Sequence, residues 1–125
     1  MNDEHERKLA GQSHIFYLLN ISFLPVIGFA LQVILWRHTR IRCLAFAMAH
    51  TRQSIIASIT AGCALTIVTG LILIIGELSS PYTWVVLILY FTLCHTTLIL
   101  LGILGYARAN AGKQFMFFHY ATWWG

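Results

Sequence analysis

A single histidine lies deep inside an uncharged stretch of this chain, where an ionisable side chain is costly and often functional. His95 could bind haem, donate to a quinone or pass on a proton. A bis-histidine haem needs a second histidine at the same depth. If Gly105 marks the membrane edge, His38 and His50 lie about 14 Å away along the helix axis. We therefore expect His95 to be a neutral, buried histidine bonded to a nearby hydroxyl or carbonyl group, and we predict no cofactor.

Other reactive residues do not form a recognisable catalytic or metal-binding pattern. Cys94 precedes His95, but adjacent residues point about 100° apart on a helix and do not face each other. Cys43, Cys63 and Cys94 lack the Cys-x-x-Cys or Cys/His spacing of a zinc site. Gly112-Lys113 lacks the upstream glycine of a phosphate loop. The sequence therefore predicts no catalytic residues, no metal site and no enzyme activity.

The composition is that of a membrane protein. Of the 125 residues, 58% are hydrophobic and 10% are charged, whereas soluble domains are roughly a quarter charged. The net charge of +4 comes from cations clustered between apolar runs, which is not the basic face of a nucleic-acid-binding protein. These cations are expected to set the membrane topology and to contact lipid headgroups.

The hydrophobic pattern predicts an all-α integral membrane protein with three transmembrane helices, a short interfacial amphipathic segment and an aromatic C-terminal tail. Three apolar runs are each long enough to cross a hydrocarbon core about 30 Å thick, and we expect Pro25 to kink the first. The single domain, 1–125, divides into a polar N-terminus (1–14), a first span (15–36), a basic loop with the interfacial segment (37–53), a second span (54–76), an external turn (77–81), a third span (82–105) and an interfacial tail (106–125).

The distribution of Lys and Arg predicts the orientation. The 37–53 loop has four of these residues and the tail has two, whereas the N-terminus has two and the 77–81 turn has none. Because positive charge favours the cytoplasmic side, we expect the loop and the C-terminus in the cytoplasm and the N-terminus outside.

Small residues recur every four positions along the second span, which would let another helix approach closely. They are Ser54, Ser58, Gly62, Thr66 and Gly70, and we expect Gly102 and Gly105 of the third span to complement them. This row could pack against the chain's own helices or against another protein. The interpretation we adopt is an accessory or structural subunit that contacts membrane lipids and a larger membrane complex or further copies of itself. The alternatives are an oligomeric transport or protein-translocation component and a haem- or quinone-binding subunit that uses His95.

Three short motifs resemble a known family. They are a proline-containing first span (Leu24-Pro25), a His-x-x-Gln entry to the second span (His50 to Gln53) and an Ala-x-x-Gly-Lys exit from the third (ending in Gly112-Lys113). The chain resembles the small bacterial membrane proteins related to the chloroplast import component Tic-twenty. The resemblance implies a bacterial inner-membrane location and a scaffold or partner-binding role, and it highlights His50, Gln53, Gly112 and Lys113 at the cytoplasmic edge. Relatives continue into an aromatic-x-x-proline segment that this chain lacks.

Overall fold

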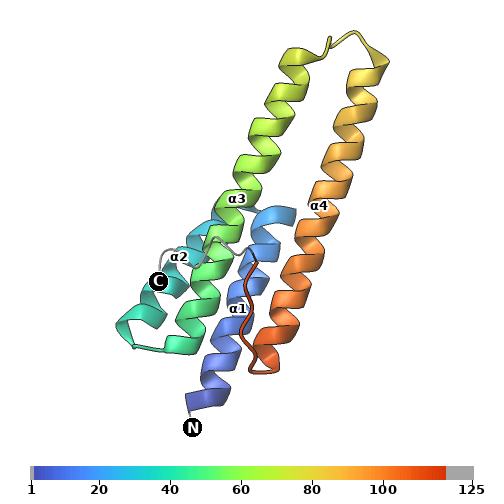
Figure 1. The fold of residues 1–125 in the computed structure, drawn as a ribbon. Helices are drawn as coiled ribbons and strands as arrows, with labels where there is room; N and C mark the ends of the chain where they lie inside the picture. The colour runs from blue at the N-terminus through green and yellow to red at the C-terminus, as the bar shows by residue number, and fades with distance from the viewer. Residues whose placement is uncertain (1, 118–125) are drawn as a thin grey trace.

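The computed structural model describes residues 2–117 and confirms an all-helical fold. The number and bounds of the helices differ from those expected. The four helices are α1 (Asn2–Ser22), α2 (Pro25–Ile41), α3 (Ala45–Ile75) and α4 (Pro81–Asn110). As Figure 1 shows, α3 and α4 form a long pair, and α1 and α2 form a shorter hairpin beside one half of that pair.

Two of the helices, α3 and α4, are long and apolar enough to cross a membrane. They have 31 and 30 residues, or about 46 and 45 Å at the usual helical rise. Only 11% of the most apolar window of each is buried, so most of these side chains are not packed inside residues 2–117. The two helices contain the expected spans 54–76 and 82–105 almost entirely. They are joined by the expected turn, closed by a hydrogen bond from Ser80 N to Glu77 O.

The first expected span, 15–36, is not confirmed, because its residues belong to two helices. Leu24 has φ −132° and ψ 75°, and Pro25 is the first residue of α2. A proline disfavours helical backbone at the preceding residue, so α1 ends at Ser22. Beyond the turn, Gly28 packs directly on Asn20, whose backbone nitrogen would lie 2.5 Å from a Cβ at residue 28. The proline therefore reverses the chain where we had expected a kink.

The expected interfacial segment within 37–53 is also not observed as a separate element. The helix α2 continues to Ile41, and α3 already begins at Ala45. The reversal between them is tight, with Cys43 in the left-handed region at φ 52°. The apolar residues 43–49, which we had expected to form this segment, therefore lie mostly in the first turn of α3. The tail likewise begins later than expected, because residues 106–110 complete α4.

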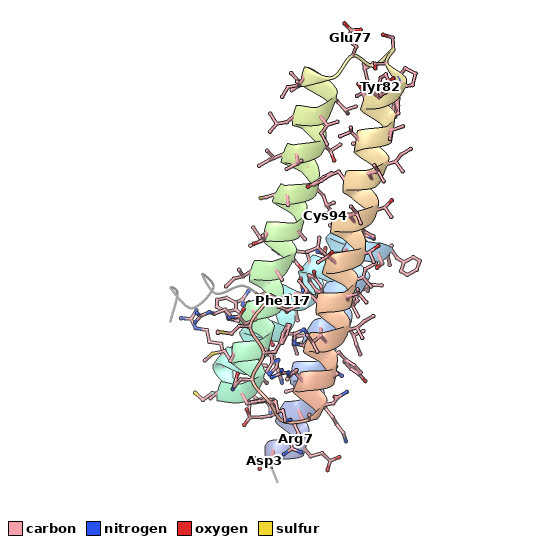
Figure 2. All side chains as sticks on the ribbon, turned by 45° about the vertical axis from the view of Figure 1, so that its right-hand side comes forward. Asp3, Arg7, Glu77, Tyr82, Cys94 and Phe117 are labelled. Carbon is pink, nitrogen blue, oxygen red and sulfur yellow. The ribbon has the colours of Figure 1, made fainter. Side chains whose placement is uncertain are left out.

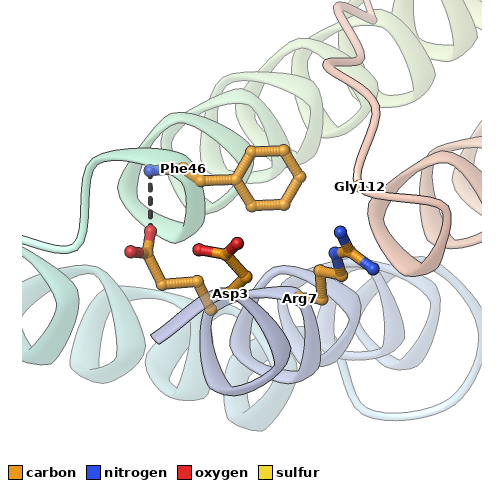
Figure 3. A pocket seen from close by; sticks show the side chains of 5 residues that line it. Asp3, Arg7, Phe46 and Gly112 are labelled. Carbon is orange, nitrogen blue, oxygen red and sulfur yellow. Dashed lines mark hydrogen bonds between the residues drawn. The ribbon is translucent and has the colours of Figure 1, made fainter. Parts of the chain in front are cut away.

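The polar N-terminus is helical and docks against the rest of the protein. Helix α1 packs against α2, α3 and α4, and its buried residues include Ala10, His14 and Tyr17. Near its start, the carboxylate of Glu6 accepts a hydrogen bond from the backbone nitrogen of Phe46 at 2.9 Å (Figure 3). It also accepts one from the backbone nitrogen of Ala47 at 3.3 Å. Because these amides at the start of α3 have no partner within that helix, Glu6 acts as a cap supplied by another helix.

Loss of this cap should destabilise the protein. We expect Glu6→Ala to lower the free energy of unfolding by about 1 kcal/mol, the typical value of an N-terminal cap, measured by denaturant unfolding in detergent micelles. The matched control is Glu4→Ala, which removes an exposed carboxylate that forms an ion pair with Lys8 at 3.0 Å. Equal stability of the two variants would show that Glu6 does not cap α3.

Candidate functional site

A buried pair of histidines lies between α1 and α3. His14 Nε2 lies 2.9 Å from His50 Nδ1, and His50 Nε2 lies 3.1 Å from the carbonyl oxygen of Lys113. A carbonyl oxygen only accepts, so a neutral His50 carries its proton on Nε2 and accepts from His14 Nε2–H. His14 Nδ1 is then an acceptor, and it has no hydrogen-bond partner within residues 2–117. The pair thus forms a directed chain of hydrogen bonds from α1 to the segment after α4.

The residues around this histidine pair exclude water from it. Both rings are fully buried, and the ring of His14 lies 5.9 Å from that of Phe115 and 5.4 Å from that of Phe117. A Cβ at Gly105 would lie 2.5 Å from His14 Nδ1. Burial, assisted by the nearby His50 ring, lowers the pKa of His14 to about 3. His14 therefore stays neutral at physiological pH, and the pair holds residues 113–117 against the bundle.

A second polar contact joins α2 to α3. Gln32 donates to the carbonyl oxygen of Ser54 at 3.2 Å and accepts from the hydroxyl of Ser58 at 2.8 Å. All three residues are buried. Both ends of the amide are paired, so Gln32 holds α2 against Ser54 and Ser58. These two residues begin the row of small residues on α3, which continues through Gly62, Thr66 and Gly70.

The small-residue row on α3 is therefore divided into two parts. Ser54 and Ser58 are covered, whereas, apart from the adjacent part of α3 itself, no atom of residues 2–117 lies within 4 Å of a Cβ built on Gly62 or Gly70. Gly102 and Gly105 do not complement this row as expected. They receive α1 instead, because a Cβ at Gly102 would lie 2.7 Å from the side chains of Tyr17 and Leu18.

Two apolar grooves follow the uncovered part of the row. One, of about 820 Å³, lies between α3 and α4 and includes Thr66, Gly70 and Phe91 in its lining. The other, of about 590 Å³, lies at the turn of the α1–α2 hairpin and includes Pro25, Gly62 and Thr66. Because the two share Leu65 and Thr66, they form one continuous strip along α3.

His95 does not join the histidine pair. Its ring is half-buried and stacks on Phe91 with the centroids 5.3 Å apart. His14 meets α4 at Gly105, ten residues from His95 or about 15 Å along the helix. Within residues 2–117, no three His, Cys, Asp or Glu side chains gather as metal ligands. A cofactor at His95 stays a prediction.

The remaining expected site residues are placed as follows. Of the family-motif residues, His50 bonds the backbone of Lys113, Gly112 has φ +68°, and Gln53 is buried with its side-chain oxygen unpartnered in the described part of the chain. Cys43 and Cys63 are exposed free thiols and Cys94 is a partly buried one. The part of the aromatic tail from residue 118 onward lies outside the described residues.

Sequence reasoning missed His14 and Tyr17. We had assigned His14 to the polar N-terminus and Tyr17 to the first span. Ala10, His14 and Tyr17 recur at spacings of four and three residues, which places them on one helical face. That spacing was the available signal for a buried helix starting well before residue 15.

No family model, curated protein or solved structure matches this chain. The resemblance to the Tic-twenty-related proteins therefore stays a prediction.

Acidification should weaken the fold through His14. The pKa of His14 is about 3 in the folded protein and about 6.5 when unfolded. Below pH 6.5 the unfolded state binds the proton first. Stability attributable to this group is therefore complete above pH 6.5 and falls by up to about 1.4 kcal/mol per pH unit below it.

The measurement is denaturant unfolding in micelles at several pH values between 7.5 and 4.5. We expect His14→Gln to reduce the slope and His5→Ala, at an exposed histidine, to leave it unchanged. An unaltered slope in His14→Gln would contradict the assignment.

Proposed function

We propose that this chain is an integral membrane protein that acts as an accessory or structural subunit of a larger membrane complex by helix packing. Its α3 and α4 cross the bilayer. The support is that both helices expose their apolar side chains, among them Ile74 at 82% and Leu93 at 67%. Exposed apolar area costs roughly 25 cal/mol per Å² in water and nothing comparable in hydrocarbon.

The observation that carries the packing role is the divided row on α3. Over Ser54 and Ser58, this face already binds a helix, because Gln32 of α2 bonds there. The same row continues through Gly62 and Gly70, where the space is open. Small residues in membranes serve close helix approach. The upper half of the row therefore has the surface of a helix-binding site without a helix from residues 2–117.

The side chains that line the groove between α3 and α4 indicate what kind of partner would bind there. Its lining is mainly apolar, with aromatic rings from Trp84 and Phe91 and hydroxyl groups from Thr66, Thr69 and Thr92. A lipid-soluble helix with a small residue at the crossing point and a side chain able to bond a threonine hydroxyl fits this lining. We infer that the partner is a transmembrane helix of another subunit.

The charges favour one orientation. Arg37, Arg40, Arg42 and Arg52 lie on segments at the same end of the bundle as Lys113. Figure 2 places Glu77 at the opposite end, whereas Asp3 and Arg7 are at the basic end. The positive-inside rule then puts the basic end in the cytoplasm of a bacterial inner membrane. The N-terminus belongs on this side too, in contrast to the orientation expected from the three-span topology.

A large side chain in the groove between α3 and α4 should weaken the association with the partner subunit. We expect Gly70→Leu to lower recovery of a co-purifying subunit from native membranes by about tenfold, the equivalent of roughly 1.4 kcal/mol. Because no other helix of the described residues comes within 4 Å of a Cβ at Gly70, we expect the fold of residues 2–117 to be unaffected. Gly62→Leu tests the groove at the hairpin in the same way.

The control is Leu93→Phe, which adds bulk at an exposed position outside the groove lining. Mass spectrometry of the purified material distinguishes a different subunit from a second copy of this chain. Unchanged recovery with both glycine variants would rule out this row as the interface.

A further inference from the structure

The turn of the α1–α2 hairpin exposes a cluster of large apolar side chains. Phe23 and Val26 are each 82% exposed, Ile27 is 53% exposed and Leu24 is 45% exposed. No charged residue lies between Lys8 and Arg37. Such a cluster is rare on a surface that faces water.

Part of the backbone of this turn is satisfied within the chain, whereas the N–H groups of Val26 and Ile27 at the start of α2 have no capping side chain in residues 2–117. Phe23 N and Leu24 N both donate to the carbonyl oxygen of Leu19, at 3.1 and 3.0 Å, and Gly28 N donates to that of Leu24 at 2.8 Å. Pro25 has no N–H to satisfy. Unpaired backbone groups are what exclude most loops from lipid, each costing several kcal/mol. The hydrogen bonds made here lower that cost at the point where the apolar side chains are exposed.

The depth of the turn is fixed by its contacts with α3. Pro25 and Val26 line the same groove as Gly62 and Thr66. Residues 53–76 of the chain are uncharged, which corresponds to about 36 Å of helix. The α3 residues of this groove run from Ser58 to Thr66, or about 8 to 20 Å into that stretch. The hairpin turn is therefore in the half of the apolar zone nearer the arginines and reaches towards its middle.

The base of the hairpin has the residues of a membrane interface. The guanidinium of Arg40 lies 5.3 Å from the ring centre of Trp36, and Arg37 and Arg42 flank it in the sequence. Tryptophan and arginine are typical of the headgroup level. From Pro25 to Trp36 is about 16 Å of helix, close to half of a hydrocarbon core about 30 Å thick.

We propose that the α1–α2 hairpin inserts into the cytoplasmic leaflet alone and makes the protein a wedge that favours curved membranes. This inference rests on the proposed membrane insertion of α3 and α4. The four helices of residues 2–117 then occupy one leaflet, and of these only α3 and α4 extend into the other, because α1 and α2 lie beside one half of the α3–α4 pair (Figure 1). The added volume expands the cytoplasmic leaflet, so the protein fits best where that leaflet is convex.

Depth measurement tests the insertion. The full chain is given single spin labels at Phe23→Cys or Leu93→Cys and reconstituted in phosphatidylethanolamine–phosphatidylglycerol vesicles. Cys63 and Cys94 are replaced by alanine, and Cys43 by glycine because its φ is 52°. Leu93 is 67% exposed near the centre of α4 and serves as the depth reference.

We expect both labels to collide with lipid-soluble oxygen and to be protected from a water-soluble nickel chelate to the same extent. An aqueous signal at Phe23 with a lipid signal at Leu93 overturns the wedge and leaves the membrane function standing. Protection of Phe23 from both reagents also overturns it, since a protein then covers the turn. An aqueous signal at Leu93 overturns the proposed function itself.

Curvature preference is measured on tubes pulled from giant vesicles of the same lipids. An impermeant dye on the amino terminus shows only molecules whose hairpin lies in the outer, convex leaflet. We expect an enrichment of about twofold or more in the tube relative to a lipid dye, because insertion into one leaflet is curvature-sensitive. An even distribution overturns the proposal.

The variant pair Val26→Asp and Ile41→Asp separates the turn from its base. Both side chains are strongly exposed, at 82% and 79%, but Val26 is at the turn and Ile41 is beside the arginines. A charge in the hydrocarbon is costly. We expect Val26→Asp to abolish the tube enrichment and Ile41→Asp to keep it. Equal behaviour of the two overturns the assigned depth.

Discussion

The packing of α1 into the space between α3 and α4 is the constraint on which the rest of the structure depends. It requires glycine at two positions of α4, because a Cβ at Gly102 would lie 2.7 Å from Tyr17 and one at Gly105 would lie 2.5 Å from His14. It also removes polar side chains of α1 from water. A buried polar atom without a partner costs about 1 to 3 kcal/mol. Loss of the hydrogen bonds of His14 and Tyr17 would therefore destabilise the packing of α1. Tyr17 donates to Leu98 O at 3.1 Å, and His14 bonds His50.

The same contacts tie distant parts of the chain together. His50 is on α3, and its second ring nitrogen bonds the backbone of Lys113 after α4. Glu6, two turns before His14 on α1, caps the start of α3. Helix α1 therefore caps the start of α3 through Glu6. Through His14 and His50 it also holds the chain that follows α4. Apolar contacts alone would leave the axial position of α1 less well defined, because hydrogen bonds are directional.

The sequence predicts the long helices well and the hairpin poorly, for physical reasons. An uncharged run of more than 20 residues must be helical in lipid, since only helices satisfy their own backbone. That argument holds for α3 and α4 without knowledge of contacts. Pro25 is different, because a proline permits either a kink or a chain reversal. The close contact of Gly28 with Asn20 decides between them, and it depends on where α1 packs.

The position of the hairpin also explains why one face of α3 behaves differently along its length. Over Ser54 and Ser58 the face is filled from within the chain, whereas beyond Thr66 the hairpin has already turned back. The described part of the chain supplies no further helix to cover Gly70. A partner helix and the inserted hairpin therefore use the same face at different depths. Each can fail without the other, because the first depends on small residues of α3 and the second on exposed residues around Pro25.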